Sequence, residues 1–280
     1  MSLDQVVTGI IYLVATFIIF LLGKWVFNKF NSHYDLHFEL LKNDNFALAL
    51  AVTGYYLGLI FALGGVLDGP SKGWTEDLID ILFYGIFAII LLNIAGIINE
   101  KIILSKFSLE DEIIRDRNAG AGAISGGNYL AAGLVVAGAI QGEGDLMTAI
   151  VFWLIGQAVL ILASRVYDLI TPFDVHEHIE KDNIAVGVAF AGVLIAFGNI
   201  IRISIYGDFI SWRANLTEFG TFVLFGLIML PIVRFITDKL LLPGEKLTDE
   251  LVNQEKPNVG AGVIEAFSYI AASLLLGWVV

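Results

Sequence analysis

Eight long apolar stretches constrain the fold of this chain more than any other feature of its sequence. A helix that crosses the bilayer core needs roughly 20 mostly apolar residues. Eight segments meet that length: 5–27, 46–67, 78–98, 119–140, 146–165, 184–203, 219–237 and 259–280. They are apolar on all sides and do not alternate with period two, which favours helices over a membrane barrel. We therefore predict an all-α integral membrane protein with eight transmembrane helices.

The composition agrees with a membrane protein and narrows the possible chemistry. Hydrophobic residues make up 57% of the 280 positions and charged residues 16%, against about 45–50% and about 25% in soluble domains. The chain has no cysteine, which excludes disulfides and thiolate metal sites. It also lacks the glycine-rich phosphate-binding and dinucleotide-binding motifs. We expect no enzymatic activity, no cofactor and no nucleic-acid partner.

The basic residues predict the orientation in the membrane. Of the 16 lysines and arginines, all but Lys72, Arg202 and Arg213 lie in or beside the links that follow odd-numbered segments. The positive-inside rule makes those links cytoplasmic and puts both termini outside. The outer side carries nine carboxylates against three basic residues and would attract cations, although a solvated outer face explains the same pattern.

One pattern occurs four times along the chain, each time where an even-numbered segment begins. A short amphipathic stretch leads to one asparagine, and small residues follow two, four and, in three copies, nine positions later. The asparagines are Asn45, Asn118, Asn183 and Asn258, and the glycines among the small positions are Gly54, Gly120, Gly122, Gly127, Gly187, Gly192, Gly260 and Gly262. The pattern predicts four tandem two-helix repeats in parallel orientation, over residues 1–70, 71–141, 142–208 and 209–280, related by an axis along the membrane normal.

These features resemble a known family. The charged approach, the N-x-A-x-[AG] start and the span ending IFALGGVLDG are similar to the YjfL-like bacterial inner-membrane proteins, catalogued as domain of unknown function 350. The resemblance covers essentially the whole chain as four units, and the fourth departs most, with Pro257 before its asparagine and Glu265 inside its span. It implies an integral inner-membrane protein whose biochemical function is unassigned, and it carries no catalytic residues over.

The repeated residues allow a structural and a functional interpretation. Each asparagine side chain can cap the helix that it precedes, or the four amides can form a polar ring at the cytoplasmic mouth of a central pathway. The small residues make a groove where neighbouring helices approach closely, because packing drives helix association in lipid. We therefore expect the even-numbered spans inside the bundle, with the bulkier odd-numbered spans around them.

Five polar side chains lie deeper in the predicted spans, and interhelical hydrogen bonding is the expected role of the amides. They are Asn93, Asn128, Gln157, Asn199 and Glu265. Asn128 is a candidate for an interhelical hydrogen bond or a pathway. Glu265 lies about 10 Å beyond Asn258, at ~1.5 Å per residue, where the other copies have Val52, Ser125 and Phe190. A charge at that depth costs about 2.5–3.5 kcal/mol, so the side chain faces the interior, pairs or is protonated. A functional carboxylate and a neutral structural one both fit.

All four histidines lie in the first and third predicted cytoplasmic links. They are His33, His37, His176 and His178. The HYDLH and HEH spacings make them candidate metal ligands, but the H-E-x-x-H motif of metalloproteases does not occur. Histidines at the membrane interface are the preferred interpretation, and we predict no metal site.

The sequence therefore predicts a channel- or transporter-like membrane protein. Its pathway or cavity would lie on the axis that relates the repeats and would favour a small cation or a polyamine. The alternative is a membrane scaffold that transports nothing and recruits a protein partner, for envelope stress or membrane remodelling, through its cytoplasmic links. Apart from the lipid bilayer, the sequence names no partner.

Overall fold

The computed structural model describes residues 3–142 and 144–279, and eight long helices run through them. They are α1 (Leu3–Phe30), α3 (Phe46–Leu67), α4 (Trp74–Ile98), α6 (Ala119–Ile140), α7 (Leu146–Ile170), α9 (Ile184–Ser204), α10 (Trp212–Ile236) and α11 (Val259–Val279). Each overlaps one predicted span and is long and apolar enough to cross a membrane. The predicted fold class is confirmed. Glu143 and Val280, which fall in the predicted outer side and the eighth span, lie outside the described residues.

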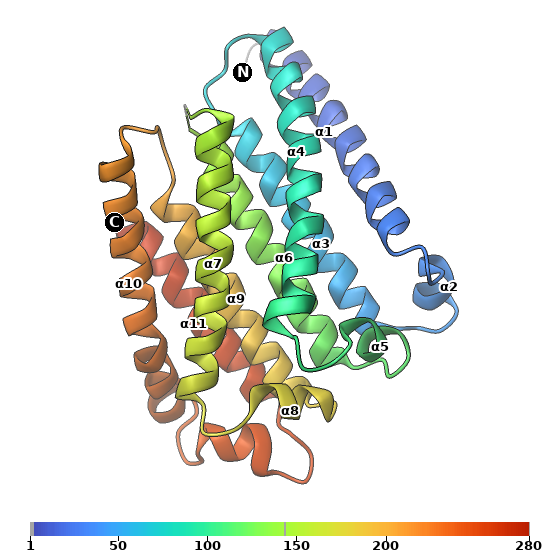
Figure 1. The fold of residues 1–280 in the computed structure, drawn as a ribbon, viewed down its shortest axis with the longest axis vertical. Helices are drawn as coiled ribbons and strands as arrows, with labels where there is room; N and C mark the ends of the chain where they lie inside the picture. Colours follow the sequence, from blue (N-terminus) through green and yellow to red (C-terminus); the bar gives the residue numbers. More distant parts are fainter. Residues whose placement is uncertain (1–2, 143, 280) are drawn as a thin grey trace.

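Short helices gather at one end of the bundle, which runs along the right and bottom of Figure 1. They are α2 (Leu36–Leu41), α5 (Leu109–Ile114), α8 (Val175–Glu180) and the π-helix η3 (Asp249–Asn253), each just before an even-numbered span. Two further π-helices, η1 (Asn99–Ile103) and η2 (Thr237–Leu241), continue α4 and α10 at this end. The four repeated asparagines also lie here, so we call it the asparagine end and the other the opposite end.

The even-numbered spans α3, α6, α9 and α11 lie side by side in a row, which passes behind α4 and α7 in Figure 1. Glycines hold neighbouring helices close, because a Cβ at any of them would meet the next helix. Helix α6 meets α3 through Gly54 and Gly122, α9 meets α6 through Gly120, Gly127 and Gly187, and α11 meets α9 through Gly192 and Gly262. Such close approach is the main source of helix association in lipid. Gly260 differs from the others, since a Cβ there would contact only its own helix cap.

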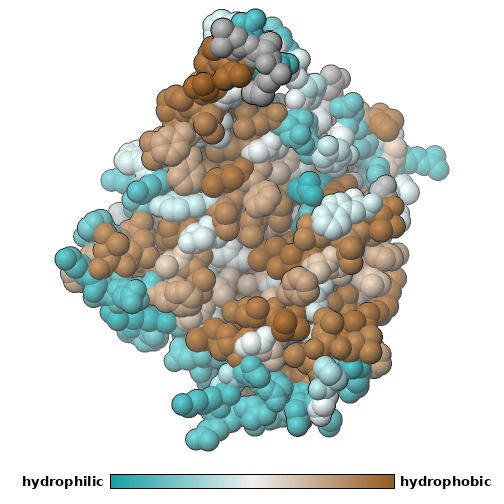
Figure 2. All heavy atoms as spheres, turned by 180° about the vertical axis from the view of Figure 1, so that it is seen from behind, coloured by the Kyte–Doolittle hydropathy of each residue, from teal (hydrophilic) through white to brown (hydrophobic). Residues whose placement is uncertain are grey.

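The odd-numbered spans cover one face of the row and do not surround it as expected. Helix α4 contacts α3 and α6, α7 contacts α6 and α9, and α10 contacts α9 and α11, while α1 contacts α4 and α3. The other face is turned outward and carries exposed apolar side chains such as Leu57, Phe61 and Phe267. Figure 2 views the molecule from behind and shows this mainly apolar surface between two hydrophilic ends.

The angle between the small residues on each helix explains the row. Small residues at the fourth position face the preceding row helix, and those at the ninth face the following one. Five residues separate them, which places the two contacts about 140° apart around a helix of 3.6 residues per turn. A ring of four helices around a central axis needs a much sharper angle. In the fourth copy Phe267 replaces the ninth-position glycine and is 59% exposed, so the row ends there.

Candidate functional site

The four repeated asparagines cap their helices. The side-chain oxygens of Asn45, Asn118, Asn183 and Asn258 accept hydrogen bonds from the backbone N–H three residues later, at 3.0, 3.0, 3.1 and 3.2 Å. Each oxygen thereby satisfies one of the free donors in the first turn of the span. This is the structural role that the sequence analysis weighed against a polar ring.

The amide nitrogens of three of these asparagines connect neighbouring repeats. Asn45 donates to the carbonyl of Ile113, Asn118 to that of Ile179 and Asn183 to that of Leu251, at 2.9, 2.5 and 2.8 Å. Each acceptor belongs to the short helix of the next repeat. These asparagines are at most 4% exposed. The ring of amides around a pathway is therefore wrong, because the row gives each amide a carbonyl of the next repeat instead of water.

The fourth asparagine lies at the end of the row. No further repeat follows it within the described residues, so Asn258 has no carbonyl of a next repeat as acceptor. Its amide donates to Glu250 of its own repeat, at 2.7 Å, as the amide of Asn118 also donates to Glu112 at 2.8 Å, and Asn258 is exposed. Asn128, the deeper candidate, is 1% exposed and donates to the carbonyl of Ala95 in α4, at 3.2 Å. Its side-chain oxygen has no hydrogen-bond partner within the described residues. Asn128 therefore joins α6 to α4 and does not line a passage.

Glu265 is fully buried and forms an ion pair with Arg234 of α10. The same carboxylate oxygen accepts from the hydroxyls of Tyr269 and Tyr167, at 3.2 and 3.5 Å. A charge inside a membrane protein is tolerated when it faces the bundle interior and is paired. The sequence analysis expected such surroundings for Glu265 but did not identify Arg234, which it counted only toward orientation. An arginine inside the predicted span 219–237 was the signal that could have found it.

Aromatic rings complete the surroundings of the Arg234 guanidinium. Its central carbon lies 5.9 Å from the ring centroids of both Tyr167 and Phe173, within the range of a cation–π attraction. A further guanidinium nitrogen donates to Thr248 at 3.4 Å. In the second half of the chain, the side chain of Arg234 thus fills the space between α7, α10 and α11.

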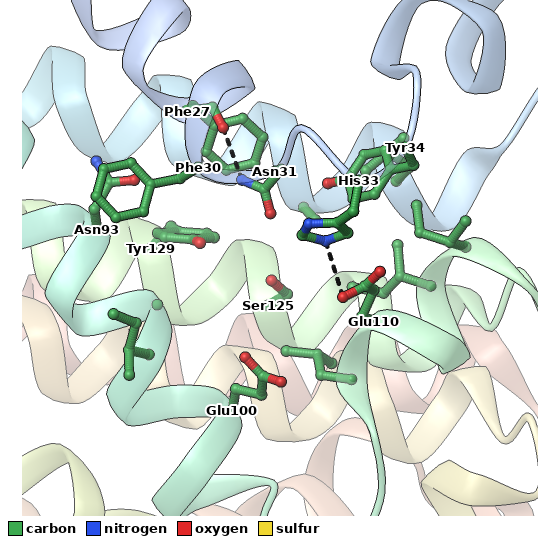
Figure 3. Close-up of a pocket in the computed structure, with 17 residues that line it drawn as sticks. Phe27, Phe30, Asn31, His33, Tyr34, Asn93, Glu100, Glu110, Ser125 and Tyr129 are labelled. Carbon is green, nitrogen blue, oxygen red and sulfur yellow. Dashed lines mark hydrogen bonds and ion pairs between the residues drawn. The ribbon is translucent and has the colours of Figure 1, made fainter.

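The first half of the chain has an open cavity of about 190 Å³ at the asparagine end, between α1, α4, α5 and α6 (Figure 3). We call it the asparagine-end cavity. It is far larger than the roughly 10–15 Å³ that one water needs. The polar and aromatic residues of its lining are Phe27, Phe30, Asn31, His33, Tyr34, Asn93, Glu100, Glu110, Ser125 and Tyr129.

Several polar groups of this cavity have no partner in the protein. Ser125 is 4% exposed, and its hydroxyl makes no hydrogen bond within residues 3–142 and 144–279. Figure 3 shows it at the centre of the cavity, with Glu100 below and Asn31 and Tyr129 above. Glu100 is exposed and has no ion-pair partner in the same part of the chain. A hydroxyl that faces an open cavity without a protein partner is free to hydrogen-bond to water or to a ligand.

The charge of the cavity is set by carboxylates. Its lining includes Glu100 and Glu110 but no lysine or arginine. His33 lies 2.9 Å from Glu110, so its ring balances one of the two carboxylates only when it is protonated. Burial and, to a lesser extent, the charge of Glu110 raise the pKa of Tyr34, which therefore stays neutral. The cavity thus attracts cations.

The histidines serve separate contacts. His176 is 2% exposed, lies 2.7 Å from the carbonyl of Ile103 and 3.3 Å from Asp168. The ring of His178 packs against Phe173, while His37 is exposed. No group of three or more potential metal-ligating His, Asp or Glu side chains occurs in the part of the chain that the structure describes. The structure does not bring the four histidines together.

The comparison with known proteins decides the family. The family model described as Domain of Unknown Function (DUF350) matches residues 1–140 and again residues 143–280. The chain belongs to the DUF350 family. One match covers two helical hairpins, so this DUF350 chain holds two copies of the family unit, whereas the sequence analysis counted four units of one hairpin each.

Two relatives are named transmembrane proteins. The chain is 24% identical over 270 residues to a UPF0719 transmembrane protein of Aquifex aeolicus (strain VF5), which covers 94% of this chain and 97% of the relative. It is 27% identical over 114 residues to the UPF0719 transmembrane protein YshE of Bacillus subtilis (strain 168), which covers 41% of this chain and 81% of YshE. No solved structure matches the chain significantly.

Proposed function

We propose that this DUF350 protein is a transporter-like inner-membrane protein that binds a small cation in the asparagine-end cavity. The observation that carries the proposal is the cavity itself, in which a carboxylate, a tyrosine and the unpartnered hydroxyl of Ser125 meet beside membrane-spanning helices. Such a concave site with a few convergent polar groups is the usual form of a small-molecule site. Binding and movement of a cation, and not catalysis, is the proposed activity.

The proposal moves the site away from the axis on which the sequence analysis expected it. Glycine contacts bring the backbones of adjacent row helices together, as at Gly54 with Gly126 and at Gly187 with Gly120, which leaves no room for a pathway between them. The cavity lies instead between the row and the layer of odd-numbered helices. In the proposed orientation the asparagine end faces the cytoplasm, where the basic links lie.

Flux through reconstituted vesicles tests this function. Purified protein in liposomes is expected to accelerate the uptake of at least one member of a panel of small inorganic and organic cations, relative to protein-free liposomes. Glu100→Gln should slow that uptake because it removes the unpaired carboxylate of the cavity. Glu76→Gln, which changes an exposed carboxylate near the other end of the same helix, is the matched control and should leave it unchanged. Equal flux with and without the protein, for every cation, refutes the function.

The closed contacts within the row favour a second candidate. A bundle without a passage suits a membrane scaffold that recruits a protein partner through the charged surface of the asparagine end, where exposed ion pairs such as Lys106 with Asp174 lie. In a pull-down, the protein with its intact cytoplasmic links should retain a partner. The same protein with the sequences of these links scrambled should lose it. Retention by both would remove this candidate.

A further inference from the structure

The two halves of the chain place different residues at one equivalent position. Ser125 and Glu265 each lie seven residues after the asparagine that caps their helix, and Tyr129 and Tyr269 each lie eleven residues after it. On the odd-numbered helices, Gly96 and Arg234 each lie three residues before the π-helix that continues α4 or α10. The pair Gly96 and Ser125 therefore corresponds to the ion pair Arg234 and Glu265.

The second half fills this position with a cation of its own. The guanidinium of Arg234 meets the carboxylate of Glu265, which also accepts from the hydroxyl of Tyr269. Its side chain is only 11% exposed and that of Glu265 is fully buried. The site therefore holds a planar, charged donor group in contact with a carboxylate and aromatic rings.

The first half places no charged side chain of α4 or α6 at this position. Gly96 has no side chain, Ser125 is far shorter than glutamate, and both line the asparagine-end cavity together with Tyr129. Tyr129 approaches Gly96 so closely that a Cβ there would overlap its phenol ring. The phenol of Tyr129 thus takes part of the space that the Arg234 side chain has in the other half, and the cavity lies beside it, lined by the hydroxyl of Ser125.

We propose that the cavity binds a guanidinium or primary ammonium group of a small organic cation, which lies beside Ser125 and Tyr129 as Arg234 lies beside Glu265 in the second half. This inference rests on the proposed function and names its ligand. The hydroxyl of Ser125 accepts a hydrogen bond from the ligand, Tyr129 offers its hydroxyl and ring, and Glu100 supplies the charge.

The lining discriminates against other ligand classes. An anion would meet Glu100 and Glu110, with no lysine or arginine in the lining to balance it. A metal ion needs several converging ligands, and no cluster of three or more suitable His, Asp or Glu side chains lies within residues 3–142 and 144–279. Because Glu100 is exposed, the ligand would enter from the asparagine end.

Calorimetric titration of the purified full-length protein with methylguanidinium tests the assignment. The wild-type protein should bind the probe. Ser125→Leu fills part of the cavity and removes the hydroxyl, so it should weaken binding by about tenfold or more, as expected for a lost hydrogen bond to a charged group. Ser125→Glu restores the carboxylate of the second half and should tighten binding by about tenfold. Glu100→Gln should weaken binding, whereas Glu76→Gln should not.

Two outcomes overturn the ligand assignment. One is the absence of binding by wild-type protein that remains folded by circular dichroism. The other is equal affinity of wild type and both Glu100→Gln and Ser125→Leu, which means that the probe binds elsewhere. The result is separable from the proposed function. Binding without flux supports the ligand and refutes transport, whereas cation flux without methylguanidinium binding or competition refutes the ligand and leaves transport standing.

Discussion

Breaking the ion pair between Arg234 and Glu265 should destabilise the protein far more than removing it altogether. Arg234→Met leaves a carboxylate that is fully buried, with only the hydroxyls of Tyr269 and Tyr167 as donors. Removing one partner of a buried pair costs about 3–5 kcal/mol because the remaining charge is uncompensated. We therefore expect Arg234→Met to lower the free energy of unfolding by about 3–5 kcal/mol.

The partner variant should have a smaller effect. Glu265→Met leaves the guanidinium of Arg234, whose side chain is 11% exposed and lies over two aromatic rings. Cation–π attraction of about 1–2 kcal/mol partly compensates the lost carboxylate. The double variant, with methionine at both positions, removes both charges and fills the site with apolar atoms, which is often nearly neutral.

Equilibrium unfolding in mixed detergent micelles, followed by circular dichroism, measures all three variants in a double-mutant cycle. The three expected values predict a coupling free energy of at least about 3–5 kcal/mol between the two positions, because the double variant is nearly neutral while the single losses add. If the two single effects add to the double effect within about 0.5 kcal/mol, the side chains are independent and the assignment of a buried pair is wrong.

Three further predictions follow from the same contacts, each measured as a change in stability by the same unfolding assay. Asn118→Ala removes both a helix cap and the donor to the buried carbonyl of Ile179, and should cost about 2–4 kcal/mol. Asn258→Ala removes an exposed cap and should cost about 1 kcal/mol. Equal losses would mean that the hydrogen bond between repeats contributes nothing to stability. Gly133→Ala places a Cβ against the backbone of Gly58 and should cost about 1–3 kcal/mol. Gly64→Ala, whose Cβ meets open space, should not destabilise the protein. A Gly133→Ala variant as stable as the wild type would contradict the packing of the row. Burial opposes the charged form of His176, but the carboxylate of Asp168, 3.3 Å from the ring, and the hydrogen bond to the carbonyl of Ile103 outweigh it and raise its pKa. Protonated His176 therefore stabilises the fold below its unfolded pKa of about 6.5, and this contribution is lost as the pH rises through the raised folded value. The wild-type Tm should fall between about pH 6 and 8, and His176→Gln should flatten that fall. If the variant keeps the wild-type pH profile, His176 is not the cause of the fall.

The spans and the helix starts within them could be predicted because their signals are local. Each span is a continuous apolar run, and each asparagine stands directly before the helix that it caps, so neither needs knowledge of distant contacts. The same holds for the small residues, whose spacing along one helix already indicates close packing.

The arrangement of the repeats could not be predicted in the same way. A row and a ring use the same small residues, and only the angle between the two contact faces separates them. The sequence already shows Phe267 in place of a glycine. That it marks the end of the row follows only from the structure, in which its side chain is exposed and no further helix of the described row packs there.

The candidate site depends on contacts between helices that sequence spacing does not show. Arg234 and Glu265 lie on different helices, and the sequence alone left pairing and protonation of Glu265 open. The cavity is harder still to predict from the sequence, because its main feature is the small size of Gly96 and Ser125 relative to Arg234 and Glu265 in the second half. A glycine and a serine inside membrane spans usually indicate packing, and only the comparison of the two halves gives them another meaning.

Cysteine labelling at position 125 tests the central claim most directly. The chain has no native cysteine, so Ser125→Cys introduces a single reactive thiol inside the cavity. Val52→Cys, at the equivalent buried position of the first repeat, is the matched control and should not react. We predict that an ethylammonium methanethiosulfonate modifies Ser125→Cys at least about tenfold faster than its ethylsulfonate counterpart, because carboxylates line the cavity, and that methylguanidinium slows the reaction. Equal rates for the two reagents, or no reaction at all, would contradict a water-accessible cation site.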